Sequence, residues 1–329
     1  MLLTGGTSLL VRRTAEQLIA RGHQVVLLQR GRSDAHIEQV QGDVRDADTV
    51  RRAMSGCDAV VHAAAKVGVV GRWEDYRSIN VDGTSVVLDT ARSVGVGSVV
   101  HVSTPSVAHA GSSLVGAGAE PPVTGRHVTG RVGAFYAESK AIAERLALAA
   151  ANSSLAVVAI RPHLVWGPGD TQLVGRIVER ARSGRLALVG GGTALVDTTY
   201  VDNAASALVA ALDAAAPGAA CSGQAYVIAN GEPRPVRELV EAIVDAAGVS
   251  AQPRNVPLRL ATIAGSLVER VWALRGTDEE PPLTRFLAEQ LGTAHWFDPR
   301  PARDDLGWVP TVSLDEGFTE LARWFATQR

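Results

Sequence analysis

The sequence predicts an α/β fold: a doubly wound parallel sheet with a smaller, mainly helical C-terminal region. Two observations predict it. In the first hundred residues, short runs that are apolar throughout alternate with stretches of helical periodicity, which is typical of parallel strands covered by helices on both faces. From residue 235 onward the pattern is mainly helical. Right-handed crossovers would place a ligand crevice at the carboxyl ends of the strands.

Each element follows from its local pattern. Residues 105–133 are rich in glycine, serine, proline and alanine, so we expect a long loop there, which in a compact domain is usually functional. Expected strands are 1–5, 24–29, a short one near Val40, 58–62, 98–103, 156–160, 198–201 and 224–228. Expected helices are 9–20, 46–54, 73–93, 136–151, 172–182 and 203–213.

Composition excludes several classes of protein. The 329 residues are 46% hydrophobic and carry a net charge of −2, which disfavours a nucleic-acid binder that neutralises phosphates. Cys57 and Cys221 lie far apart, so we expect neither a disulfide framework nor a metal site. We find no secretory signal, and the apolar runs are interrupted by Arg or Glu well before eighteen residues. A cytoplasmic location is the expectation.

The turn between the first strand and the first helix, Thr4–Val11, is placed where a dinucleotide pyrophosphate would meet the free N–H groups of a helix. The TGxxGxxG pattern is incomplete there, since Ser8 and Val11 occupy the second and third glycine positions. Ser8 can cap the helix, whereas the branched Val11 should push it away from the strand. A plain strand–turn–helix is the alternative. The cofactor contacts expected here are Gly5, Thr7, Ser8, Leu9 and Leu10.

The second strand ends in Gln29, Arg30 and Arg32 without an acid. An acid at this edge would bind the ribose 2′-hydroxyl of NAD, whereas arginines can clamp a 2′-phosphate. We therefore expect NADP(H) in preference to NAD(H), with two solvated surface arginines as the alternative. Asp43 and Val44 end the third strand, where Asp43 would hold the adenine edge or act as an ordinary helix N-cap.

Small residues follow the fourth strand in the segment from His62 to Lys66. Ala63 and Ala64 would let a flat cofactor lie against the backbone. We interpret His62 as a hydrogen-bonded core residue. Lys66 would reach a phosphate or an acidic substrate, or simply be solvated.

Tyr136 and Lys140 give the strongest signal. Four residues apart on a helix, they share one face, and only two of the 32 basic residues are lysine. An ammonium about 4 Å from the phenol is worth roughly 4 kcal/mol at an effective dielectric of about 20. It would lower the tyrosine pKa by up to about three, so that the phenol exchanges protons near neutrality. The alternative is a solvated helix face.

With these motifs the chain resembles the extended short-chain dehydrogenase/reductase superfamily over nearly its whole length. The resemblance rests on TGGTS, HAAAK, NVDGT from Asn80, the Ser-Thr pair at 103–104, YAESK and RPHLVWGPGD. The later segments VDTTYVDN, NGEP and PPLTRF narrow it to one branch. That branch contains 3-beta-hydroxysteroid dehydrogenases, sterol-4-carboxylate dehydrogenases and bacterial 2-alkyl-3-oxoalkanoate reductases of long-chain olefin biosynthesis.

The resemblance implies catalytic roles. Tyr136 would be the general acid for carbonyl reduction, and Lys140 would bind the nicotinamide ribose and lower the Tyr136 pKa. Thr104 stands where the family usually has serine and would polarise the substrate oxygen, with Ser103 or Ser106 as substitutes if the loop is displaced.

It also implies a division of the chain. Asn80 would brace the active-site helix, and Pro162 and Val165 would line the nicotinamide. A Rossmann-type dinucleotide-binding domain would comprise 1–164 plus 197–230. The substrate-binding region would comprise 165–196 plus 231–329.

The function implied is NADPH-dependent reduction of the 3-keto group of a long-chain 2-alkyl-3-oxoalkanoate to the 3-hydroxy acid. Partners would be a second copy of the chain and the pathway enzymes, a thiolase-like condensing enzyme and a beta-lactone synthetase. A 3-beta-hydroxysteroid or sterol-carboxylate dehydrogenase is one alternative. A nucleotide-sugar epimerase is disfavoured by the missing acid after the second strand. An NADP-sensing regulator would not need Tyr136 and Lys140.

Other segments remain open. The apolar residues of the stretch 256–275 recur at helix-like spacing. This helix would be a lid over an apolar substrate, a helix that binds a partner or a membrane surface, or a core helix. We expect Arg161, the segment 281–286 and the tryptophans to pack in the C-terminal part; the tryptophans are Trp296, Trp308 and Trp324.

Overall fold

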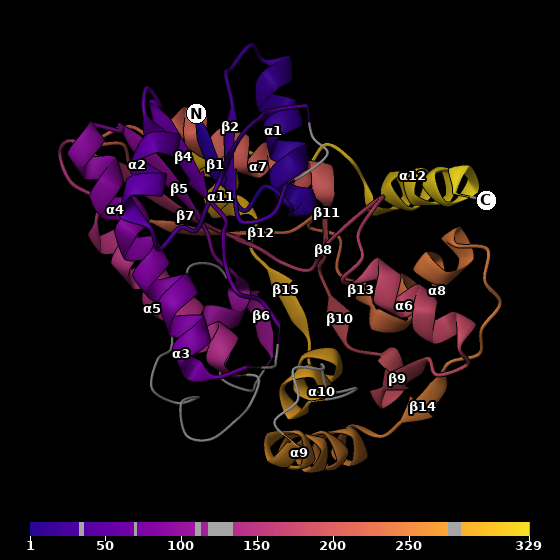
Figure 1. Ribbon diagram of the computed structural model, residues 1–329. Coiled ribbons are helices and arrows are strands. Elements are labelled where there is room, and N and C mark those ends of the chain that lie inside the picture. Colours follow the sequence, from indigo (N-terminus) through magenta and orange to yellow (C-terminus); the bar gives the residue numbers. More distant parts are fainter. Residues whose placement is uncertain (33–35, 69–70, 109–112, 118–133, 276–283, 329) are drawn as a thin grey trace.

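A parallel sheet of seven strands forms the centre of the protein, in the order β12-β7-β5-β4-β1-β2-β3 (Figure 1). The structure is a computed structural model that describes residues 1–328 except 33–35, 69–70, 109–112, 118–133 and 276–283. The strands are β1 (Leu2–Thr4), β2 (Val26–Gln29), β3 (Glu38–Gln41), β4 (Ala59–His62), β5 (Ser98–Val102), β7 (Ala156–Pro162) and β12 (Ala225–Ile228).

Helices cover both faces of this sheet because successive strand residues point to opposite sides. Leu3 and Val100 are buried with residues of α1, α7 and α11, whereas Leu2 and Val99 are buried with residues of α2, α4 and α5. The expected doubly wound α/β fold is therefore confirmed. The bounds are α1 (Leu9–Ala20), α2 (Ala47–Met54), α4 (Gly83–Val94), α5 (Ala134–Ala149), α7 (Val201–Ala214) and α11 (Arg300–Leu306).

The expected helices differ from the observed ones by only a few residues, with one internal exception. The helix expected over 73–93 consists of α3 (Trp73–Tyr76), a π-helical segment η1 (Arg77–Asp82) and α4. Single π-helical turns are frequent at functional sites, and η1 carries Asn80.

The long loop expected over 105–133 is wrong in the part that the structure describes. It contains a short 3-10 helix, η2 (Pro105–Ala108), and the strand β6 (Leu114–Ala117), which pairs with β15 (His295–Phe297). Residues 118–133 lie outside the described part of the chain. Strand β6 was missed because its pairing partner lies about 180 residues further along, which local composition cannot show.

Further short strands after Pro162 were also missed. Strands of two or three residues are too short to show alternation of apolar and polar side chains. The missed strands are β8 (Val165–Trp166), β9 (Ala187–Val189), β10 (Leu195–Val196), β13 (Arg234–Pro235) and β14 (Arg254–Val256). The strand expected at 198–201 is present as β11 (Thr199–Tyr200), reduced to two residues because α7 already begins at Val201.

The C-terminal region has its own core. Leu239 and Ile243 are buried there together with Trp166, Val178 and Leu321. These residues come from β8 and from three helices that surround the core, α6 (Val174–Arg182), α8 (Val236–Ala246) and α12 (Leu314–Thr327).

The segment 256–275 contains the helix α9 (Leu258–Arg275), which contacts α10 (Arg285–Gly292) far from the central sheet (Figure 1). Leu260, Ile263 and Leu267 on α9 are more than half exposed. The interpretation as a core helix is therefore wrong. The lid and the docking interpretations stay predictions.

One part of the C-terminal stretch returns to the central sheet. Ala302 and Leu306 of α11 and the following Trp308 are buried in the cluster that contains Leu3 and Tyr226. The expectation that Trp308 packs in the C-terminal part is therefore wrong. Trp324 does pack against the C-terminal core.

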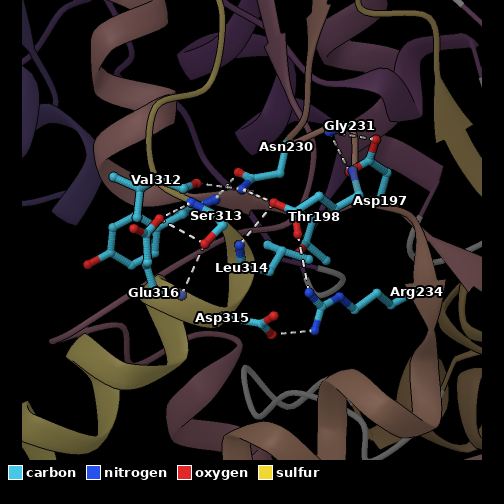
Figure 2. A network of polar contacts seen from close by, with 12 residues as sticks. Asp197, Thr198, Asn230, Gly231, Arg234, Val312, Ser313, Leu314, Asp315 and Glu316 are labelled. Atoms are coloured by element: carbon cyan, nitrogen blue, oxygen red, sulfur yellow. Dashed lines mark hydrogen bonds and ion pairs between the residues drawn. The ribbon is translucent and has the colours of Figure 1, made fainter.

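Polar contacts connect the two parts where the chain passes between them (Figure 2). The Asn230 amide donates a hydrogen bond to the Val312 carbonyl at 2.8 Å, just before α12. Arg234 forms an ion pair of 2.7 Å with Asp315 in the first turn of that helix. These contacts orient α12 relative to the end of β12. Within the described residues, no helix is long and apolar enough to span a membrane.

Candidate active site and cofactor cleft

The turn after β1 packs tightly on the segment after β4. Gly5 has a φ of +84°, and a Cβ there would lie 3.1 Å from the Ala64 nitrogen, so only glycine fits without strain. The Thr4 hydroxyl accepts hydrogen bonds from the N–H groups of Ala63 (3.1 Å) and Ala64 (3.0 Å). The turn after β1 and the segment after β4 therefore form one rigid surface at the carboxyl end of the sheet.

His62 is a hydrogen-bonded core residue, as expected. Its ring is 2% exposed and contacts the hydroxyls of Thr4 (2.9 Å) and Thr84 (3.0 Å) through its two nitrogens. Burial lowers its pKa to about 3, so the ring stays neutral. Its role is to join β1, β4 and α4.

The two departures from the glycine pattern have different outcomes. Ser8 precedes α1 at the N-cap position, but its side chain makes no capping hydrogen bond, so the expected cap is wrong; the exposed hydroxyl is left for other contacts. Val11 is completely buried in the cluster with Leu3 and Ala207. Helix α1 packs against α7, whose Ala207 and Ala211 lie in the same cluster, so the branched Val11 side chain forms part of the core.

A cavity of about 200 Å³ lies at the ends of β1, β2 and β3. Of the cofactor-binding residues expected from the sequence, the cavity brings together Gly5, Thr7, Arg30, Asp43, Val44 and Ala64. Its lining does not include Ser8, Leu9, Leu10, Arg32, Ala63, Lys66, Lys140, Pro162 or Val165. It adds Leu28, Gln29, Gly31, Gly42, Ala65 and Ile79, of which Ile79 lies on η1 and had no signal in the sequence.

Gln29 is the best test of whether this cavity fits a dinucleotide. Its side chain is 5% exposed, and its amide nitrogen donates a 2.7 Å hydrogen bond to Gln39. The amide oxygen is buried without a hydrogen-bond partner among the described residues, and a Cβ at Gly6 would collide with it. An unpaired buried acceptor is costly, and a ribose hydroxyl is a donor that would satisfy it. The residues present therefore fit the adenosine half of a dinucleotide.

Asp43 forms an ion pair rather than a helix cap. Its carboxylate accepts from the Arg45 guanidinium at 2.9 and 2.7 Å, and Arg45 is the main reason that the pKa of Asp43 is lowered. Arg30 also contributes to that lowering, and both residues line the cavity. The N-cap of α2 is Asp46, so the N-cap alternative for Asp43 is wrong.

Asn80 joins the segment after β4 to the helix of the tyrosine. Its amide exchanges two hydrogen bonds with the Lys66 backbone, of 2.6 and 3.0 Å, and donates a third to the Ser139 hydroxyl at 2.9 Å. Ser139 in turn donates to the Tyr136 carbonyl at 2.9 Å. Asn80 is 1% exposed, so this brace is rigid.

Tyr136 and Lys140 lie on α5 beside the end of β5. Thr104, the position expected to polarise the substrate oxygen, lies close enough to the Tyr136 hydroxyl to lower its pKa. The Lys140 ammonium donates to the Val102 carbonyl at 2.6 Å. Tyr136, Thr104 and Lys140 are thus gathered at the carboxyl end of the sheet. Ser103 differs, since its hydroxyl is buried without a partner among the described residues.

The pKa of Tyr136 is opposite to the sequence-based expectation. Burial raises it to about 12, and the Thr104 hydrogen bond is the effect that opposes the rise. The Lys140 ammonium does not lower it, because that charge is directed to the Val102 carbonyl and lies 3.4 Å from His101. Burial lowers the pKa of Lys140 itself to about 8.

Lys66 points to an aromatic ring. Its ammonium lies 5.3 Å from the centre of the Tyr76 ring, a cation–π geometry. The Tyr76 hydroxyl donates a 3.0 Å hydrogen bond to the Gly68 carbonyl. The structure therefore shows a partner for Lys66 at the end of α3, the helix that follows its loop.

The expectation that Arg161 packs in the C-terminal part is wrong. Its guanidinium pairs with Glu144 of α5 at 2.8 and 2.5 Å, and both side chains are at most 1% exposed. The pair ties α5 to β7, which ends at Pro162. Val165 follows on β8, beside the start of the C-terminal region.

The parallel sheet, its glycine turn and the tyrosine and lysine at its carboxyl end together define a nicotinamide-dinucleotide oxidoreductase of the short-chain type. The chain belongs to the 3-beta hydroxysteroid dehydrogenase/isomerase family, which matches residues 16–260. The family resemblance inferred from the sequence motifs is therefore confirmed.

Individual relatives are similar over almost the full length. The chain is 47% identical to a 2-alkyl-3-oxoalkanoate reductase of Stenotrophomonas maltophilia, covering 98% of both chains. It is 38% identical to a protein of the same name from Shewanella oneidensis, covering 97% of this chain and 84% of that one. It is 30% identical to a 3 beta-hydroxysteroid dehydrogenase/Delta 5-->4-isomerase of Mycobacterium tuberculosis, covering 99% and 90%.

Solved structures agree on the fold. The crystal structure of gox2253 has a TM-score of 0.77 at 24% identity, covering 99% of this chain and 98% of that one. A UDP-glucuronic acid 4-epimerase from Bacillus cereus in complex with NAD has a TM-score of 0.73 at 18% identity, with coverage of 99% and 98%. At these identities the likeness concerns the fold alone.

Proposed function

We propose that this protein is an NADPH-dependent reductase that converts the 3-keto group of a long-chain 2-alkyl-3-oxoalkanoate to the 3-hydroxy acid. The observation that carries the proposal is the 47% identity, over 98% of both chains, to a protein named for that substrate. Tyr136, with Thr104 beside it at the carboxyl end of the sheet, would be the acid of the reaction.

The chain's own residues would supply the proton and position the ketone. A bound nicotinamide cofactor contributes the hydride to the carbonyl carbon. Tyr136, whose pKa is about 12, keeps its proton at neutral pH and can transfer it to the carbonyl oxygen as the hydride arrives. Thr104 would donate a hydrogen bond to the same oxygen. Lys140, with a pKa of about 8, is still mostly charged at pH 7 and would hold the cofactor's ribose.

The remaining site assignments are part of the proposal. Gly5, Thr7 and Ser8 would meet the pyrophosphate, Arg30 the 2′-phosphate, and Asp43 with Val44 the adenine. Leu9, Leu10, Arg32, Ala63, Ala64, Lys66, Pro162 and Val165 complete the proposed cofactor contacts. Asn80 is a positioning residue. Residues 1–164 plus 197–230 would bind the dinucleotide and 165–196 plus 231–329 the substrate. A homodimer and contacts with the condensing enzyme and the beta-lactone synthetase stay predictions.

The direct test is Tyr136→Phe. We expect NADPH oxidation with a 2-alkyl-3-oxo acid to fall by at least about 10²-fold, as for loss of a general acid, while NADPH still binds with a dissociation constant within threefold. Unchanged turnover in Tyr136→Phe would contradict the role of Tyr136 as the acid. It would favour an NADP-sensing regulator, which does not need this tyrosine. Turnover of a 3-beta-hydroxysteroid but of no oxo acid would favour the steroid dehydrogenases instead.

The cofactor preference has its own test. Arg30 lines the cavity and Arg32 does not, so Arg30→Ala should lower kcat/KM for NADPH about tenfold or more and leave that for NADH nearly unchanged. Arg32→Ala is the matched control and should have the smaller effect. Equal losses with both cofactors would contradict the 2′-phosphate assignment.

A further inference from the structure

A second cavity lies inside the C-terminal region, with a volume of about 120 Å³. Its wall is formed by α6, α8 and β10, and no Asp, Glu, Lys or Arg lines it among the described residues. It is bounded on one side by Gln290 of α10 and by His295 of β15. The apolar wall includes Leu173, Ile177, Val196, Leu239, Val240 and Ile243.

The mouth of this cavity is connected to the proposed catalytic hydroxyls. The Gln290 amide nitrogen donates to the Ser106 hydroxyl at 3.2 Å. That hydroxyl accepts from Thr104 at 3.3 Å, and Thr104 lies close enough to the Tyr136 hydroxyl to influence it. Gln290 is therefore two hydrogen bonds away from Thr104, which lies beside the reacting phenol. These hydrogen bonds connect the Gln290 side of the cavity to the proposed catalytic hydroxyls.

The polar side chains at the mouth are occupied within the protein. His163 donates from Nδ1 to the Asp197 carbonyl at 2.5 Å and stacks on His295 at 5.8 Å. His295 Nε2 is 2.7 Å from the Thr293 hydroxyl. The cavity therefore presents mainly hydrocarbon to its contents, which suits an alkyl chain and disfavours a carboxylate.

The backbone at the mouth is strained. Leu164, which lines the cavity, has a φ of +42°, a region that residues other than glycine rarely adopt. This turn separates Pro162, proposed to line the nicotinamide, from Trp166 deeper in the cavity wall. Strain of this kind is frequent where a chain shapes a binding site.

We infer that this cavity binds one hydrocarbon tail of the substrate, entering between Gln290 and Leu164 while the carbonyl stays at Tyr136. The inference rests on the proposed function for the identity of the tail, but the cavity itself predicts binding of a saturated chain. Each methylene that enters should raise kcat/KM about fourfold, equivalent to about 0.8 kcal/mol.

The test combines turnover with binding. Val240→Phe places a ring in the cavity, and Glu241→Phe places the same ring at the exposed next position of α8, as a matched control. NADPH oxidation is measured with 2-alkyl-3-oxo acids in two series, one that lengthens the C3 chain and one that lengthens the C2 branch. Binding of hexan-1-ol, octan-1-ol and decan-1-ol is measured by calorimetry, which needs no turnover.

For the wild type and Glu241→Phe we expect kcat/KM to rise with length in one series and the alcohols to bind more tightly as they lengthen. In Val240→Phe both slopes should flatten, with the shortest substrate changed by less than threefold. Unchanged slopes in a folded Val240→Phe, or no alcohol binding by the wild type, would overturn the inference. Tight alcohol binding without any turnover would instead overturn the proposed function and leave the cavity assignment supported.

If Val240→Phe does not fold, as judged by its melting curve, Val240→Ala gives the opposite change. It enlarges the cavity and should move the optimum chain length upward by one or two methylenes. An unmoved optimum would count against the inference.

Discussion

At the scale of single residues, the chemistry depends on how Tyr136 keeps its proton. Burial raises its pKa to about 12, which suits a group that gives a proton to a ketone and would hinder one that must accept a proton at neutral pH. The Thr104 hydrogen bond is the only described effect that counters the rise. At neutral pH the phenol is therefore in the protonated form that a general acid for carbonyl reduction requires.

Thr104 provides a sharp prediction. Thr104→Ser keeps the hydroxyl and should keep turnover within about threefold, whereas Thr104→Val keeps the shape and should reduce kcat by about 10²-fold, as for loss of one hydrogen-bond donor at the reacting oxygen. Both are compared by NADPH oxidation, with melting temperatures as the control for folding. If Thr104→Val is as active as the wild type, the adjacent Ser103 or Ser106 must supply the hydrogen bond.

At the scale of elements, two contacts hold the catalytic helix in place. Asn80 of η1 fixes the middle of α5 through Ser139, and the buried pair of Glu144 and Arg161 ties α5 to β7. The tyrosine and lysine therefore sit on a helix anchored from both sides.

Removing one member of the pair of Glu144 and Arg161 should destabilise the folded protein. Glu144→Ala takes away the bidentate partner of a guanidinium that is 1% exposed, which we expect to lower the free energy of unfolding by about 3–5 kcal/mol. Denaturant titration measures this loss. The double variant Glu144→Leu, Arg161→Met should recover much of it, because it leaves no buried charge. A loss below 1 kcal/mol in Glu144→Ala would contradict the structural role.

Helix α1 gives a second prediction at this scale. From the sequence we expect Val11→Gly to bind nucleotide at least as well as the wild type. Because Val11 is fully buried, the same change should also destabilise the protein by roughly 2–4 kcal/mol, through an unfilled cavity and a glycine inside a helix. Calorimetric titration with NADPH measures the first expectation and thermal unfolding the second. Clearly weaker binding in a folded variant would count against the placement of the pyrophosphate.

At the scale of the whole molecule, Asp197 lies where the chain passes between the two parts (Figure 2). Its carboxylate accepts hydrogen bonds from the Gly231 nitrogen at 3.1 Å, and burial raises its pKa to about 7. Between about pH 4 and pH 7 the folded protein keeps a proton that the unfolded chain has lost. The stability that this proton confers is complete below about pH 4 and is lost as the pH rises through 7.

Asp197→Asn should remove that dependence, since the amide oxygen still accepts from Gly231 and carries no charge. We expect the melting temperature of the variant, relative to the wild type, to be higher at pH 8 than at pH 5, by a few degrees for a chain of this size. Differential scanning calorimetry at the two values checks it. An equal difference at both pH values would show that Asp197 does not titrate in this range.

Several features of the fold and site were predictable because they are local. Strands that are apolar throughout, such as Val99 and Val100 in β5, and a tyrosine and lysine one turn apart are visible in any short window of sequence. The missing glycines at Ser8 and Val11 were also visible. The burial of Val11 was not, because it packs in a cluster with residues of α7, about 200 residues away.

The doubly wound sheet followed from the periodicity of its strands and helices, and Tyr136 and Lys140 stood out by their spacing within one helix. The family, and with it the roles proposed for Thr104 and Asn80, followed from the resemblance of several motifs. Only the tertiary structure decided the direction in which the Tyr136 pKa moves, the partners of Asp43 and Arg161, and the apolar cavity behind Gln290. These depend on burial and on contacts between segments far apart in the chain, and desolvation and packing are properties of the folded molecule rather than of any stretch of sequence.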